Sequence, residues 1–89
     1  MELNITGLDE LQRQLEELQR AMESLDGPIA NLKFDPKDPA SVQRAIREME
    51  TEVDRKVAPY SGNPFVAQVV EQSKEHFRAG ILERARKQQ

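Results

Sequence analysis

Apolar residues recur every three or four positions along the first third of the chain. They are Leu8, Leu11, Leu15, Leu18, Met22 and Leu25. The residues between them are polar, charged or alanine. This spacing places the large apolar side chains along one side of an α-helix as a heptad seam. We therefore predict an amphipathic helix over about residues 7–26, ended by Gly27 and Pro28, whose leucine stripe needs a partner.

The same period predicts two further helices, near residues 39–58 and 64–86. Each follows a residue that caps helices, Asp38 or Asn63, and each has proline at its first position. The second helix carries Val42, Ile46, Met49, Val53 and Val57, and the third carries Phe65, Val66, Val69, Val70, Phe77, Ile81 and Leu82. The broader apolar face of the third helix favours burial against two neighbours.

Two short segments alternate polar and apolar residues, as strands do. Leu3 and Ile5 alternate in the first segment, and Leu32 and Phe34 in the second. Parallel strands need a connection of the length that the first helix supplies. The predicted fold class is mostly α, with three amphipathic helices, and a minor two-stranded ribbon between residues 2–5 and 31–34 is compatible with it.

The length of 89 residues predicts a single small helical domain, with a mobile C-terminal tail at residues 84–89. Only 37% of the residues are apolar and none is tryptophan, so the core is thin and association between copies would help to complete it. No apolar run is long enough to span a bilayer, and the N-terminus lacks the features of a signal peptide. We therefore expect a cytoplasmic protein without a membrane partner.

Charge is distributed unevenly along the chain. Residues 1–27 carry a net charge of −5, residues 28–59 are neutral, and residues 60–89 carry +2. This polarity favours either head-to-tail association between copies or antiparallel packing of the first helix on the last.

Candidate chemistry is sparse, and we predict no catalytic, cofactor-binding or metal-binding residues and no small-molecule substrate. There is no cysteine, His76 is the only histidine, and the four glycines are isolated. Asp35 and Asp38 lack further oxygen ligands at the spacing of a calcium loop. Lys74, Arg78, Arg84, Arg86 and Lys87 form a basic C-terminal third. A pI of about 5.2 and the lack of an aromatic platform nevertheless argue against nucleic-acid binding.

The leucine seam is the strongest single signal, and it has two interpretations. It can pack on the other two helices of the same chain, or it can form a surface for another subunit, and one helix can do both on adjacent stripes. The candidate interaction residues are Leu8, Leu11, Leu15, Leu18, Met22, Leu25, Phe77 and Ile81.

The opening segment, residues 3–11 with Leu15 and Leu18, resembles the start of small tail-completion (head–tail joining) proteins of long-tailed bacteriophages and prophages. Residues 34–39, 57–60 and 63–64 also resemble small prophage proteins encoded among morphogenesis genes. The resemblance implies a non-enzymatic structural or assembly protein. It would bind copies of itself and other phage structural proteins, in the bacterial cytoplasm during assembly and in the virion. A small helical adaptor or regulator that binds one bacterial host protein is the alternative.

Overall fold

The computed structural model describes residues 5–25 and 32–87. In these two stretches the chain forms three α-helices, α1 (Ile5–Ser24), α2 (Pro39–Val57) and α3 (Pro64–Lys87), and a short 3-10 helix, η2 (Ala58–Tyr60), connects α2 to α3. The prediction of a mostly α fold with three helices is confirmed. Each helix begins and ends within about two residues of its predicted bounds.

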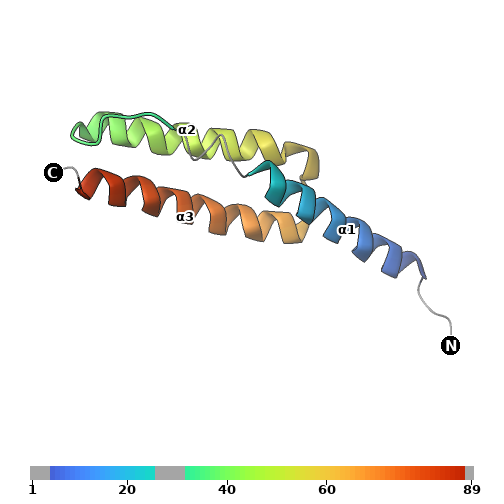
Figure 1. Cartoon of the computed structure of the whole chain (residues 1–89). Coiled ribbons are helices and arrows are strands. Elements are labelled where there is room, and N and C mark those ends of the chain that lie inside the picture. The colour runs from blue at the N-terminus through green and yellow to red at the C-terminus, as the bar shows by residue number, and fades with distance from the viewer. Residues whose placement is uncertain (1–4, 26–31, 88–89) are drawn as a thin grey trace.

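The helices α2 and α3 form an antiparallel hairpin that is the body of the molecule (Figure 1). Asp38 begins α2 by accepting a hydrogen bond from the Ala40 backbone N–H at 3.0 Å. The turn after η2 needs a residue with a left-handed backbone conformation, and Gly62 adopts it with a φ of +91°. Both predicted proline-containing helix starts, at Pro39 and Pro64, are present.

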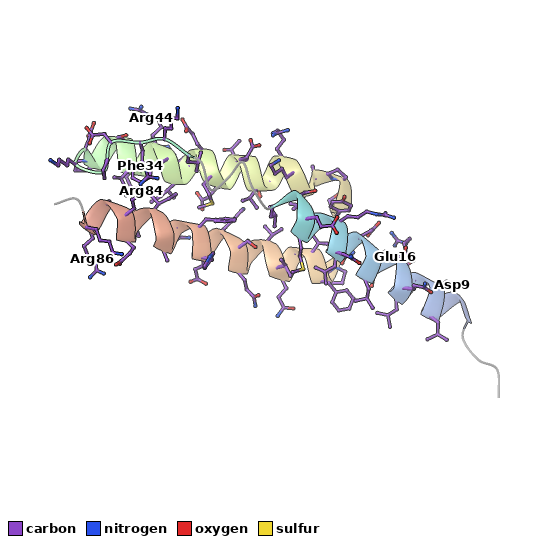
Figure 2. The ribbon with its side chains drawn as sticks, in the orientation of Figure 1. Asp9, Glu16, Phe34, Arg44, Arg84 and Arg86 are labelled. Carbon is purple, nitrogen blue, oxygen red and sulfur yellow. The ribbon has the colours of Figure 1, made fainter. Side chains whose placement is uncertain are left out.

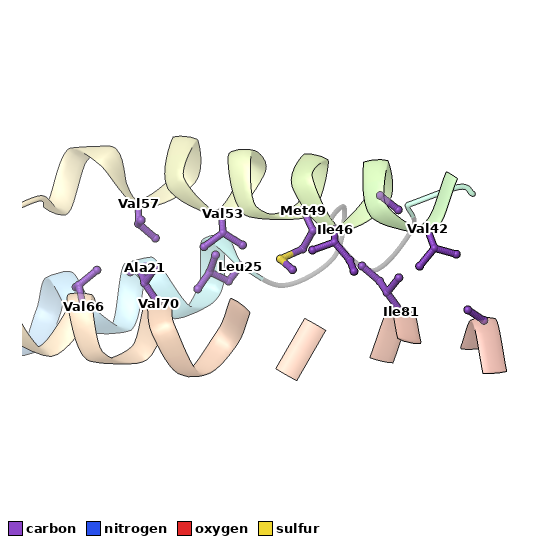
Figure 3. Packing of buried hydrophobic residues seen from close by; sticks show 12 residues of the cluster. Ala21, Leu25, Val42, Ile46, Met49, Val53, Val57, Val66, Val70 and Ile81 are labelled. Atoms are coloured by element: carbon purple, nitrogen blue, oxygen red, sulfur yellow. The ribbon is translucent and has the colours of Figure 1, made fainter. Parts of the chain in front are cut away.

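One apolar core runs along the hairpin and receives only the last turns of α1 (Figure 3). Its members are Ala21, Leu25, Val42, Ala45, Ile46, Met49, Val53, Val57, Val66, Val70, Ile81 and Ala85. Met49 and Val53 are completely buried. The core is therefore built mainly from α2 and α3, with α1 covering the part of the hairpin near η2.

The ribbon between residues 2–5 and 31–34 is not supported. Ile5 is the first residue of α1, and residues 32–34 belong to no strand. The remaining ribbon positions, 2–4 and 31, lie outside the described residues. Leu32 and Phe34 alternate with Lys33 because both apolar side chains pack against the hairpin core while Lys33 is exposed. The alternation thus reflects burial against helices and not a β-ladder.

The molecule is elongated, with extents of 64 × 18 × 17 Å. The N-terminal turns of α1 project beyond the hairpin, and the C-terminal end of α3 lies at the opposite end (Figure 1). Residues 84–87 of the predicted tail continue α3, and Ala85 is buried there. Mobility of the tail stays a prediction. Within the described residues, no helix is both long and apolar enough to cross a membrane.

Candidate functional site

The predicted leucine seam divides between the surface and the core. Leu8, Leu11, Leu15 and Met22 are 57%, 43%, 47% and 52% exposed, respectively. Leu18 is half-buried, and Leu25 is buried in the core. We call Leu8, Leu11, Leu15, Leu18 and Met22 the α1 leucine face. Leu15, Leu18 and Met22 surround a shallow hollow on it, so this face leaves apolar surface open to solvent.

The leucine face stays open because α1 packs on the hairpin through a neighbouring stripe. Ala21 is 1% exposed and forms the buried contact of α1 with the core, flanked by half-buried Leu18 and by Leu25, which directly follows the helix. A small side chain at position 21 lets α1 approach the hairpin closely. Sequence reasoning missed Ala21 because a search for large apolar residues passes over alanine. The signal in the sequence was the position of Ala21, three residues after Leu18 and directly before Met22, which places it next to the seam.

Asn63 joins α1 to the hairpin and is itself 4% exposed. Its Oδ1 accepts hydrogen bonds from the backbone N–H groups of Phe65 at 2.9 Å and Val66 at 3.2 Å, which caps α3. Its Nδ2 donates to the Gln14 carbonyl and to Glu17 Oε1, both at 2.9 Å. The capping role follows from the sequence, whereas the second role, orienting α1, depends on residues more than 45 positions away.

Charged residues border the leucine face on its solvent side. Asp9, Glu16 and Glu23 each follow a residue of the seam, and none forms an ion pair with a described residue (Asp9 and Glu16 are labelled in Figure 2). Other acids of α1 are paired: the Arg13 guanidinium binds Glu10 and Glu17, and its hydrogen bond lowers the pKa of Glu10. The acidic side chains beside the leucine face can therefore pair with basic groups of another chain.

A second apolar surface lies near the other end of the hairpin. It is a groove of about 300 Å³, which we call the Phe34 groove. Its lining residues are Leu32, Phe34, Met49, His76, Phe77, Gly80, Ile81 and Arg84. The Arg84 guanidinium lies over the Phe34 ring at 4.8 Å from its centroid. The groove therefore has an apolar floor and a basic rim.

The remaining two predicted interaction residues, Phe77 and Ile81, both belong to the Phe34 groove. Phe77 is half-buried and packs against the core, and its ring is 5.9 Å from that of the exposed His76. Ile81 is 8% exposed and belongs to the core. The structure thus places the two groups of predicted residues on separate surfaces, α1 and the α2–α3 groove.

The basic residues of α3 differ in their pairing. Lys74 Nζ donates to Asp54 Oδ1 at 2.8 Å, a link between α3 and α2 that raises the pKa of Lys74. Glu83 pairs with both Arg86 and Lys87. Arg78 and Arg84 have no carboxylate partner among the described residues. A continuous basic stripe of the kind that binds nucleic acid is therefore interrupted by acidic partners.

Comparison with known proteins places the chain in a family. Residues 5–89 match the YuaX protein family. The chain belongs to the YuaX family. It is 42% identical over 88 residues to a protein of Escherichia coli (strain K12) described as "Uncharacterized protein YuaX", and the alignment covers 99% of this chain and 91% of that one. No solved structure matches the chain. The match includes all three helices, so the leucine face and the Phe34 groove both lie within the YuaX region.

Proposed function

We propose that this YuaX-family protein is a non-enzymatic helical protein that acts by binding protein chains, and first of all copies of itself, through the α1 leucine face. The observation that supports the proposal is the exposure of four large apolar side chains on one helix, between 43% and 57% each. Single exposed apolar residues are common on soluble proteins, but a contiguous apolar stripe is typical of an interaction surface.

The free energy gained by burying the leucine face limits how tightly this face can bind a partner. Burying the exposed half of a leucine or methionine side chain contributes roughly 1 kcal/mol. Four such side chains contribute about as much as the lowest estimates of the cost of association, which begin near 4 kcal/mol. A partner must therefore supply apolar surface of its own for a stable complex.

The setting that we propose is virion assembly, which the resemblance of residues 3–18 implies. The protein would then act in the bacterial cytoplasm during assembly and become part of a phage or prophage particle. Co-purification with particles would support this setting. Recovery of one host protein, without incorporation into particles, would favour the helical adaptor instead.

Absolute mass in solution, measured by light scattering after size exclusion over a wide concentration range, tests self-association. We expect the wild-type chain to form oligomers whose mass rises to a defined value. Leu15→Glu replaces one strong helix former with another at a half-exposed position, so the helix should persist while association weakens. Arg20→Gln, which lowers the net charge by the same one unit at an exposed position on the side of α1 away from the seam, is the matched control and should associate like wild type. A wild-type chain that stays monomeric at all concentrations would contradict the proposal.

A further inference from the structure

The two apolar surfaces of this molecule lie in regions of opposite charge. The leucine face is on α1, bordered by Asp9 and Glu16, and the Phe34 groove is toward the far end of the hairpin, where Arg84 lies (Figure 2). The first 27 residues carry −5, whereas residues 60–89 carry +2. Opposite charge around two exposed apolar surfaces is the arrangement that complementary protein interfaces have.

The two surfaces also match in spacing. Leu15, Leu18 and Met22 lie at positions i, i+3 and i+7 of α1. On the α3 side of the groove, Phe77, Gly80 and Arg84 repeat the same spacing. Each set therefore covers two helical turns, about 10 Å at 1.5 Å per residue. A helix laid along the groove could place its apolar side chains beside Phe77 and its acidic residues beside Arg84.

Gly80 leaves room for an incoming side chain at the middle of this spacing. A Cβ built on Gly80 would have no atom within 4 Å. Its φ is not in the left-handed region, so the helix itself does not require glycine there. The missing side chain opens the groove to close approach by another helix.

We propose that the α1 leucine face of one molecule docks into the Phe34 groove of a second molecule, head to tail. This inference rests on the proposed function and names the surface that α1 binds. The alternative pairing of two α1 helices would bring together two segments of charge −5, whereas docking on the groove brings that segment beside Arg84. Since each molecule carries both surfaces at different places, the interface is heterologous and successive copies close into a ring or extend as a filament.

The groove is tested with Gly80→Glu in the full-length chain. Glutamate is a better helix former than glycine and meets no atom of its own chain at Cβ, so folding should be retained. It would fill the groove and place negative charge where the acidic border of α1 must dock. We expect the Kd for self-association to rise at least about tenfold, as it should for Leu15→Glu. Gly80→Ala is the size control: its methyl group adds bulk but no charge, so it should weaken association less than Gly80→Glu does. Circular dichroism verifies that each variant is folded.

Mixing the two glutamate variants separates the head-to-tail interface from every symmetric one. Leu15→Glu keeps its groove and Gly80→Glu keeps its leucine face, so the mixture can form one intact interface. We expect each variant alone to be monomeric at concentrations where wild type associates, and the equimolar mixture to form a 1:1 heterodimer by light scattering or native mass spectrometry.

The outcomes distinguish this inference from the proposed function. If Gly80→Glu associates like wild type while Leu15→Glu does not, the leucine face pairs with a surface other than the groove, and the head-to-tail inference is wrong although the proposed function stands. A mixture that stays monomeric would likewise overturn the inference. If wild type never associates, both fail together.

Discussion

At the scale of single residues, Asn63 links two helices through one short side chain. One side chain caps α3 with its oxygen and holds α1 with its nitrogen, through Gln14 and Glu17. The amide group is suited to both tasks because it offers an acceptor and two donors. Since Asn63 is buried, a substitution removes hydrogen bonds to two helices at once, although Glu17 keeps its ion pair with Arg13.

Asn63→Ala should therefore destabilise the protein by about 1–3 kcal/mol, the sum of a lost cap and a lost buried hydrogen bond. Asn63→Ser keeps a capping oxygen but is too short to reach α1, so it should recover about half of that loss. Urea unfolding measures both values.

Amide hydrogen exchange gives a second, independent readout. Both variants should lose protection in the last turns of α1, around Ala21, more than in the hairpin. Equal destabilisation by serine and alanine would mean that the cap contributes nothing, and unchanged exchange in α1 would mean that Asn63 does not hold it.

At the scale of elements, α1 and the hairpin differ in how far their apolar faces are buried. The hairpin encloses Met49 completely, whereas Met22 on α1 is 52% exposed. Packing on α2 and α3 should therefore account for most of the stability of the isolated molecule. The outer side of α1 contributes little until a partner covers it.

The two methionines offer a matched test of this difference. Met49→Ala should reduce the free energy of unfolding by about 2–5 kcal/mol, because it leaves a cavity in the core. Met22→Ala removes the same atoms from a half-exposed site and leaves no enclosed cavity, so it should change the free energy of unfolding by about 1 kcal/mol or less in dilute protein. Urea titrations below the concentration of self-association give both values. A loss at position 22 comparable to that at position 49 would show that the leucine face is buried in the monomer.

At the scale of the whole molecule, the separation of charge along a 64 Å shape determines how association responds to salt. Acidic and basic regions attract each other in a head-to-tail contact, and added salt screens that attraction. Two α1 segments facing each other would instead repel, and salt would relieve the repulsion. The sign of the salt effect therefore depends on the geometry of assembly.

We expect the Kd for self-association of the wild-type chain to rise severalfold between about 50 and 500 mM NaCl, a range over which the Debye length falls below 5 Å. Arg84→Gln should bind more weakly at low salt and respond less to added salt, since it removes one basic group from the rim of the groove. Sedimentation at several ionic strengths measures both. Tighter association at high salt would argue for α1 helices paired with each other.

Local signals in the sequence were enough to predict the three helices and the residues that begin two of them. Periodicity and capping are local properties: a stripe every three or four residues and a polar residue before proline act within a few positions of each other. The same local information identified Phe77 and Ile81 as candidate interaction residues. It did not predict that they share a groove with Phe34. It also left open a minor ribbon that the structure does not support, because alternation at Leu32 and Phe34 is the same whether the buried side faces a helix or a strand.

Which part of the leucine seam is exposed depends on how the helices pack together. The heptad pattern treats Leu15 and Leu25 alike, yet one is 47% exposed and the other 6%. The difference comes from the orientation of α1 on the hairpin, which depends on close packing at Ala21 and on the hydrogen bonds of Asn63. Contacts between residues so far apart in the chain leave no periodic signal in either segment, so burial along the seam is a property of the assembled helices.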